Sequence, residues 1–168
     1  MNIYLVGFMA TGKTTLGKEI ARRKKWHFLD LDEFIELREK RIISDIFARE
    51  GEAYFRRSEK KALKEVSREK KFVVACGGGI VVDKENIKIM QETGKVICLV
   101  ASVKAILERT RGHSQRPLLK VDDPRQQIEL LLKLRKPFYA RIKKSVDTSR
   151  CTIKEAADRI LKIIPKTR

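Results

Sequence analysis

The run Gly7-Phe8-Met9-Ala10-Thr11-Gly12-Lys13-Thr14 follows the pattern G-x-x-x-x-G-K-[ST]. An apolar, strand-like run at residues 3–6 precedes it, and a helix-like pattern begins at Lys13. In this context the pattern binds phosphate, because the glycines let backbone N–H groups face the anion and the helix N-terminus adds positive charge. The motif predicts a nucleotide site, with Lys13 at the β/γ-phosphates and the Thr14 hydroxyl on Mg²⁺. A glycine-rich turn without a ligand is the alternative.

Short apolar runs alternate with amphipathic stretches along the rest of the chain. The predicted strands cover residues 3–6, 28–31, 72–75, 96–100 and, more weakly, 145–147. The predicted helices cover residues 13–24, 32–38, 52–68, 83–92, 103–109, 124–140 and 152–164. Apolar strands that alternate with helices are typical of a parallel sheet covered on both faces. We therefore expect a three-layer α/β/α fold of the P-loop NTPase type, with a central parallel sheet of about five strands.

The domain organisation follows from the absence of dividing segments in the sequence. No internal repeat, low-complexity tract or Pro/Gly/Ser-rich linker interrupts the 168 residues, so a single domain over residues 1–168 is expected. One long polar stretch, residues 110–124, carries Gly and Pro and fits neither helix nor strand. A loop of this length in a compact domain is either disordered or functional. We interpret it as a mobile lid.

The net charge of +17 is the unusual bulk property of the chain. It favours polyanions such as nucleic acid, anionic membranes or phosphorylated metabolites, although basic and acidic residues are interspersed as on a solvated surface. No apolar run approaches the ~18 residues of a membrane span, and the strand at the N-terminus leaves no room for a signal peptide. Three cysteines without a C-x-x-C pair and two histidines argue against a disulfide framework and a His/Cys metal site. A cytoplasmic protein that binds no membrane is expected.

Two aspartates, Asp30 and Asp32, occur where the second predicted strand ends. Residues two apart in a strand point to the same side, so the two carboxylates are predicted to converge beside the phosphate loop. One would hold Mg²⁺ through water, and the other would accept a proton from an attacking hydroxyl. The alternative is that Asp32 simply caps a helix over residues 33–37.

Glycines and arginines extend the candidate site. Three glycines at the end of the predicted strand 72–75 permit a close approach of the backbone to a ligand, with an ordinary turn as the alternative. They are Gly77, Gly78 and Gly79. Most arginines in a chain with 39 Lys and Arg lie in solvent, but three have settings that favour a site, beside aromatic residues, in the lid and near a helix end. They are Arg56, Arg116 and Arg135.

As a set, these motifs resemble those of shikimate kinase over nearly the whole chain. Several are loose individually, but their order and spacing together are specific. In chain order they are residues 7–14, Phe28-Leu29-Asp30-Leu31-Asp32 with Ile35-Glu36, Ile46-Phe47-Ala48 with Gly51-Glu52, Phe55-Arg56 and Glu59, Gly77-Gly78-Gly79, Arg109-Thr110 with Arg116-Pro117-Leu118-Leu119, and Arg135 with Tyr139.

The resemblance implies ATP as phosphate donor and Mg²⁺ as cofactor. Lys13, Asp32 and Arg116 would be catalytic, with Arg116 meeting the phosphates as the lid closes. Thr14 and Asp30 would hold the metal ion. The residues implied to bind ATP are Phe8, Met9, Ala10, Thr11, Gly12, Lys13, Thr14, Arg109 along the adenine, Arg116 and Arg150.

On the acceptor side the resemblance implies shikimate, phosphorylated on its 3-hydroxyl to shikimate 3-phosphate in chorismate and aromatic amino acid biosynthesis. Asp32 would contact the attacking hydroxyl, Arg56 and Arg135 would hold the substrate, and Glu59 would fix the arginines. The implied substrate-binding residues are Asp32, Arg56, Gly77, Gly78, Gly79, Arg135, Glu59, and Phe47 and Phe55 as an apolar wall. A monomer is expected.

Two residues depart from the family's usual pattern. Ala10 occupies a position that is often glycine, and alanine is tolerable there only if the position needs no positive φ. Cys76 precedes the triple glycine where Ser or Thr is usual, and a thiol is a poorer hydrogen-bond partner for a hydrated Mg²⁺. Neither change touches Lys13, Asp32 or Arg56.

Other functions stay open on the sequence alone. They are another small-metabolite P-loop kinase such as gluconate kinase, a nucleoside monophosphate kinase, a nucleotide-controlled switch, and a nucleic-acid-binding module that uses the +17 charge. The Asp-x-Asp, triple-glycine and Arg-Pro-Leu-Leu motifs together point away from the other kinases. Aromatic residues at 7% with Trp26 alone of its type provide no stacking platform, so no specific nucleic acid is expected.

Overall fold

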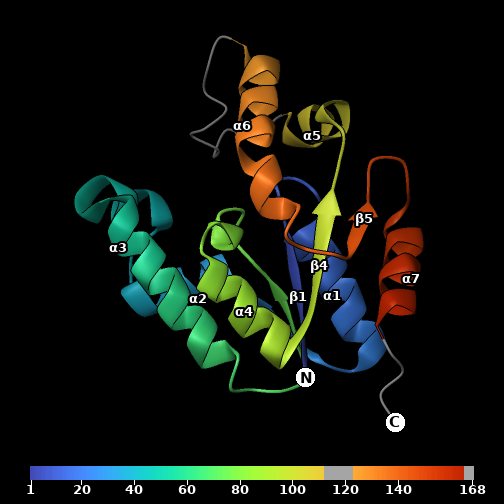
Figure 1. Cartoon of the computed structure of the whole chain (residues 1–168), viewed down its shortest axis with the longest axis horizontal. Helices are drawn as coiled ribbons and strands as arrows, with labels where there is room; N and C mark the ends of the chain where they lie inside the picture. The colour runs from blue at the N-terminus through green and yellow to red at the C-terminus, as the bar shows by residue number, and fades with distance from the viewer. Residues whose placement is uncertain (112–122, 165–168) are drawn as a thin grey trace.

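The computed structural model describes residues 1–111 and 123–164, which form a parallel sheet between layers of helices (Figure 1). The sheet has five strands in the order β2-β3-β1-β4-β5. The strands are β1 (Asn2–Gly7), β2 (His27–Asp30), β3 (Phe72–Ala75), β4 (Gly94–Val100) and β5 (Ser145–Asp147). The helices are α1 (Lys13–Lys24), α2 (Leu31–Glu39), α3 (Ile43–Val66), the 3₁₀ helix η1 (Ile80–Val82), α4 (Lys84–Thr93), α5 (Val103–Thr110), α6 (Pro124–Tyr139) and α7 (Ile153–Ile163). This architecture confirms the predicted α/β/α fold.

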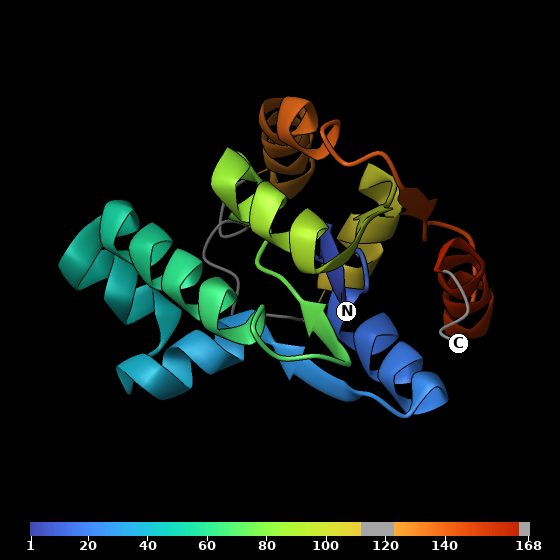
Figure 2. The same cartoon turned by 60° about the horizontal axis from the view of Figure 1, so that its bottom comes forward.

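Each face of the sheet is covered by its own helices, which can be followed in Figure 2. Alternate residues of β1 point to opposite faces, because side chains in a strand alternate. Ile3 and Leu5 lie in an apolar cluster with α1 and α7, whereas Tyr4 and Val6 lie in a cluster with α3 and α4. All four side chains are fully buried. Burial on both faces explains why the strands are continuous apolar runs in the sequence.

The strand order brings three distant segments to one edge of the sheet. β1 lies between β3 and β4, and β3 lies between β1 and β2. All of these pairings are parallel, so β1, β3 and β2 end at the same edge. The loop at residues 7–14 leaves β1, the triple glycine follows β3, and Asp30 ends β2. This arrangement places the predicted donor and acceptor groups together.

Two boundaries differ from the prediction. α2 begins at Leu31, so Asp32 lies in a helix and not in a strand. α3 begins at Ile43, nine residues before the predicted start, and is broken at Gly51, whose φ of 81° and ψ of 174° are not helical. The predicted lid at 110–124 falls mostly on residues 112–122, which lie outside the described residues together with Arg116. Among the described helices, none has the length and apolar character needed to cross a bilayer.

Asn2 links the start of the sheet to the connection between α3 and β3. Its side chain is fully buried. The amide nitrogen donates to the carbonyls of Val66 and Glu69 at 3.3 and 3.0 Å, and the amide oxygen accepts from the Phe72 N–H at 3.1 Å. These bonds satisfy main-chain groups at the end of α3, in the connection that follows it and at the start of β3.

We expect Asn2→Ala to lower the free energy of unfolding by about 2–4 kcal/mol, because it removes the hydrogen bonds of a fully buried side chain to three main-chain groups. Urea denaturation would measure the change. Gln91→Ala, at an exposed position in α4, is the control and should change stability by less than about 0.5 kcal/mol. A loss below about 1 kcal/mol for Asn2→Ala would show that water replaces these bonds easily.

Candidate active site

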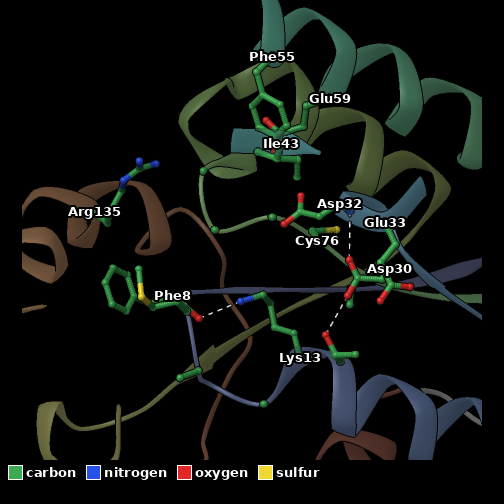
Figure 3. Close-up of a pocket in the computed structure, with 18 of the residues that line it drawn as sticks. Phe8, Lys13, Asp30, Asp32, Glu33, Ile43, Phe55, Glu59, Cys76 and Arg135 are labelled. Carbon is green, nitrogen blue, oxygen red and sulfur yellow. Dashed lines mark hydrogen bonds between the residues drawn. The ribbon is translucent and has the colours of Figure 1, made fainter. Parts of the chain in front are cut away.

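A cavity of about 920 Å³ opens where β1, β3 and β2 end, and Figure 3 shows many of the side chains around it. This volume is in the range of small-molecule sites. Most of the predicted site residues line it, namely Phe8, Met9, Ala10, Gly12, Lys13, Thr14, Asp30, Asp32, Phe47, Phe55, Arg56, Glu59, Gly77, Gly78, Gly79, Arg109 and Arg135. Two predicted residues do not line it: Thr11 is a buried residue of the phosphate loop, and Arg150 is exposed.

The phosphate loop forms one wall of the cavity. Lys13 Nζ donates to the Phe8 carbonyl at 2.8 Å (Figure 3). It also donates to the Gly7 carbonyl at 2.9 Å. Gly7 has a φ of 140°, and a Cβ there would lie 2.2 Å from the Leu99 carbonyl oxygen of β4. Only glycine therefore lets the chain leave β1 this close to β4.

Asp30 connects this loop to α2. One of its carboxylate oxygens accepts from the Thr14 hydroxyl at 2.9 Å, and the other accepts from the Asp32 N–H at 3.1 Å (Figure 3). Asp30 is therefore the N-cap of α2, and Asp32 is in the first turn. The predicted reason for the convergence of the two carboxylates, alternation along a strand, was wrong, and so was the alternative that Asp32 is the cap. The cap itself places both aspartates on the cavity.

Arg109 fixes the middle of the phosphate loop. Its guanidinium donates to the Ala10 carbonyl at 3.0 Å and to the Thr148 hydroxyl at 3.2 Å, and also bonds the Thr148 carbonyl. Thr148 in turn donates to the Thr11 carbonyl at 3.0 Å. Ala10 has a φ of 58°, so this position does adopt the left-handed conformation that the sequence left open.

Two buried carboxylates lie on the opposite wall. Asp32 Oδ1 and Glu59 Oε1 are buried and have no hydrogen-bond partner among the described residues. A Cβ on Gly77 would lie 2.8 Å from the first oxygen and 3.0 Å from the second, so both face the same small volume. Burial, together with the charge of Asp30, raises the pKa of Asp32 to about 6. Burial also raises the pKa of Glu59 to about 7, although Arg56 opposes the shift.

Arg56 is held between Glu59 and the triple glycine. Its guanidinium donates to Glu59 Oε2 at 2.8 Å and also pairs with Glu52 at the surface. A Cβ on Gly79 would lie 2.3–2.6 Å from the guanidinium atoms of Arg56. The φ of Gly79 is −96°, so the backbone would accept other residues, and contact with Arg56 is what requires glycine.

Arg135 approaches the cavity from α6, across from Asp32 and Glu59 (Figure 3). Its Nη1 is buried and lacks a partner among the described residues. The cavity therefore contains unpaired groups of both signs, one guanidinium nitrogen and two carboxylate oxygens. Such an arrangement suits a ligand that carries both a carboxylate and hydroxyl groups.

An aromatic pair closes the apolar side of the cavity. Phe47 and Phe55 have ring centroids 4.8 Å apart. In an unbroken helix these residues would be separated by about 12 Å of rise. The break at Gly51 turns the first part of α3 back and brings the two rings into contact. The predicted helix began at residue 52, so it included neither the break at Gly51 nor the helical segment that carries Phe47.

Comparisons with known proteins agree with this geometry. The family model described as shikimate kinase matches residues 9–165. The shikimate kinase of Thermoanaerobacter pseudethanolicus is 46% identical, over 96% of this chain and 94% of its own, and that of Thermodesulfovibrio yellowstonii is 41% identical, over 96% and 93%. The chain belongs to the shikimate kinase family. It is an ATP-dependent phosphotransferase of the shikimate pathway, as predicted.

Solved shikimate kinases share the fold. The enzyme from Acinetobacter baumannii, in complex with shikimate, superposes with a TM-score of 0.89 at 37% identity, over 96% of this chain and 91% of that one. The enzyme from Bacteroides thetaiotaomicron gives 0.89 at 32% identity, over 97% of each chain. The solved structures therefore support the same family as the sequence comparisons.

Cys76, one of the two departures from the family's usual pattern, is almost completely buried. Its Sγ lies 3.9 Å from the Val74 carbonyl and 4.0 Å from the Met90 sulfur. Burial raises the pKa of this thiol well above its ordinary value, so it stays neutral. Cys76 thus packs as a small apolar group beneath the site.

Several residues at or behind the cavity were not predicted to act there. Tyr139 was part of the family pattern without a role, and Thr148 lies in a short segment after a weak strand. Neither position has a sequence signal that shows which group its hydroxyl contacts. The other lining residues outside the prediction are Thr15, Glu33, Glu36, Ile43, Ala75, Cys76 and Leu131.

We expect Ala10→Gly to raise the free energy of unfolding by about 0.5–1 kcal/mol. Glycine relieves about 1–2 kcal/mol of left-handed strain and gives back part of it in chain entropy. Denaturant unfolding measures the change. Ala48→Gly, at an exposed position inside the first part of α3, is the matched control and should lower stability by about 0.5–1 kcal/mol. The prediction fails if both variants lose stability.

We expect Asp32→Asn to be more stable than the wild type at pH 8 and about equally stable at pH 4. The raised pKa means that the folded state binds the Asp32 proton more tightly than the unfolded state, so this group's contribution to stability falls as pH rises from about 4 to about 6. Unfolding free energies at both pH values test this. Asp45→Asn, at an exposed position, is the control. A less stable Asp32→Asn protein at pH 8 would contradict the assigned burial cost.

Proposed function

We propose that this cavity transfers the γ-phosphate of ATP to the 3-hydroxyl of shikimate, with ATP on the phosphate loop and shikimate among Asp32, Arg56 and Arg135. The observation that carries the assignment is the set of unpaired polar atoms on Asp32, Glu59 and Arg135, which face a cavity bounded on its other side by Lys13. Shikimate carries both a carboxylate and hydroxyls, the two kinds of group that these atoms would bind. The A. baumannii relative, solved with shikimate, supports the choice of acceptor.

Mg²⁺ fits the donor set between the loop and α2. The Thr14 hydroxyl and the Asp30 carboxylate are already in hydrogen-bond contact at 2.9 Å, and oxygen ligands of this kind suit a hard divalent cation. Thr14 would bind the ion directly and Asp30 would support it. The ion would neutralise charge on the phosphates, while Lys13 would hold the β- and γ-phosphates from the loop.

Asp32 is the proposed partner of the attacking hydroxyl. It lies near enough to Lys13 for the positive charge to lower its pKa in opposition to burial. The resulting pKa of about 6 leaves the carboxylate ionised at neutral pH and still able to accept a proton. Because phosphoryl transfer has a loose transition state, orientation should matter more than proton removal, and we assign Asp32 about 10²–10⁴-fold of the rate.

The two arginines are the proposed clamp for the shikimate carboxylate. A guanidinium offers paired N–H donors that match the planar carboxylate, which an ammonium group does not. Glu59 accepts from Nη1 of Arg56 at 2.8 Å, and Glu52 accepts from Nε and Nη2 at 3.2 Å. One N–H on each of Nη1 and Nη2 is left for the ligand. Arg116 and the lid stay predictions outside the described residues. The monomeric state likewise stays a prediction.

The test of this assignment is a coupled assay with ATP, Mg²⁺ and shikimate. We expect Arg56→Lys to raise the KM for shikimate at least about tenfold, since the paired charge-assisted hydrogen bonds are lost, with the KM for ATP nearly unchanged. Arg57→Lys, at the neighbouring exposed position, is the matched control and should change neither.

An unchanged shikimate KM in Arg56→Lys would remove Arg56 from the site. The same assay with gluconate and with nucleoside monophosphates tests the other P-loop kinase activities. Faster turnover of one of these than of shikimate would overturn the proposed acceptor.

A further inference from the structure

Tyr139 connects the triple-glycine loop, Gly77-Gly78-Gly79, to the helix that carries Arg135. It is the last residue of α6 and is partly buried. Its hydroxyl donates to the Gly78 carbonyl at 2.8 Å. Its ring packs against two apolar clusters. One is the cluster of β1 with α3 and α4, and the other is a small cluster around Phe8, Ile106 and Ile128. Burial raises the pKa of the phenol, so the hydroxyl remains a donor throughout the neutral range.

The same end of α6 is weak in its own hydrogen bonds. Pro137 lies inside the helix between Arg135 and Tyr139 and has no N–H to donate to the Lys133 carbonyl. A proline in a helix interior is a common cause of bending. The direction of this last turn, and with it the position of Arg135, is therefore set largely by tertiary contacts. The hydroxyl of Tyr139 is one such contact, with a defined partner.

Arg135 and Tyr139 lie on the same face of α6, because residues four apart in a helix are neighbours. Gly78 lies between two glycines that touch charged groups, Gly77 beside Asp32 and Glu59, and Gly79 against Arg56. One hydrogen bond thus joins the support of Arg135 to the loop on which Arg56 packs.

We infer that Tyr139 is a positioning residue that sets the separation between Arg135 and Arg56, and thereby the fit of the acceptor's carboxylate. This inference rests on the proposed role of the two arginines. Tyr139 acts through Arg135 and does not touch the reacting atoms. Loss of its hydroxyl should weaken binding of shikimate more than binding of ATP, because the hydroxyl bonds the triple-glycine loop and not the phosphate loop.

The test is Tyr139→Phe, which keeps the ring packing and removes only the hydroxyl. We expect the KM for shikimate to rise about five- to tenfold, the effect of one lost hydrogen bond, while kcat and the KM for ATP change less than about twofold. Tyr54→Phe is the matched control, because its hydroxyl donates to Glu39 at 2.9 Å away from the cavity, and it should change none of these constants.

A double-mutant cycle with Arg135→Lys separates a positioning role from general support of the fold. If Tyr139 acts through Arg135, then Tyr139→Phe changes the shikimate KM less than about twofold in the Arg135→Lys background. Additive effects overturn the inference, as does a shikimate KM that is unchanged in Tyr139→Phe. An equal rise in the KM for ATP, or a variant too unstable to fold, shows a structural role and also overturns it.

The single variants distinguish failure of the arginine clamp from failure of the positioning role. If Arg135→Lys leaves the shikimate KM unchanged, the proposed arginine clamp fails and the role of Tyr139 fails with it. If Arg135→Lys raises the KM and Tyr139→Phe does not, the clamp stands and only the positioning role is lost.

Discussion

The site depends on a sheet that is buried on both faces, because such a sheet can offer polar groups to a ligand only where its strands end. β1, β3 and β2 are neighbours and parallel, so three segments far apart in the chain meet at one edge. The nucleotide loop, the triple glycine and the aspartate pair each follow one of these strands. Donor and acceptor groups therefore face one cavity, although no local sequence rule connects them.

The wall of the cavity that holds Asp32 and Glu59 concentrates negative charge in a buried place, where charge lowers the stability of the folded state. Asp32 and Glu59 both have raised pKa values because they are buried, and each has one oxygen without a partner among the described residues. Arg56 neutralises part of this charge, but it does not satisfy the remaining oxygens. Unsatisfied buried groups lower stability and are retained at sites where a ligand completes them. The cavity thus suits a polar ligand, and its unsatisfied groups lower the free energy of unfolding.

Much of the fold, and most of the residues that line the cavity, could be predicted from the sequence, since strand–helix alternation and the phosphate motif are local patterns. Geometry was harder. Asp30 and Asp32 converge because one caps the helix that contains the other, whereas strand alternation was the predicted cause. The contact between Phe47 and Phe55 requires a helical segment before the break at Gly51, and the predicted helix began only at residue 52. The left-handed conformation of Ala10 is imposed by its neighbours in the loop, which alanine does not signal.

The triple glycine shows how absent side chains can determine the placement of charges. A methyl group on Gly77 would approach two carboxylate oxygens, and one on Gly79 would overlap the guanidinium of Arg56. Gly78 is different, because a methyl group there would meet its nearest neighbours at an ordinary 3.6 Å. Its contribution is the carbonyl that accepts from Tyr139. The outer glycines thus let charged side chains approach the main chain, and the middle one fixes that main chain to α6. A larger side chain at either outer position would push these charged groups away from the main chain.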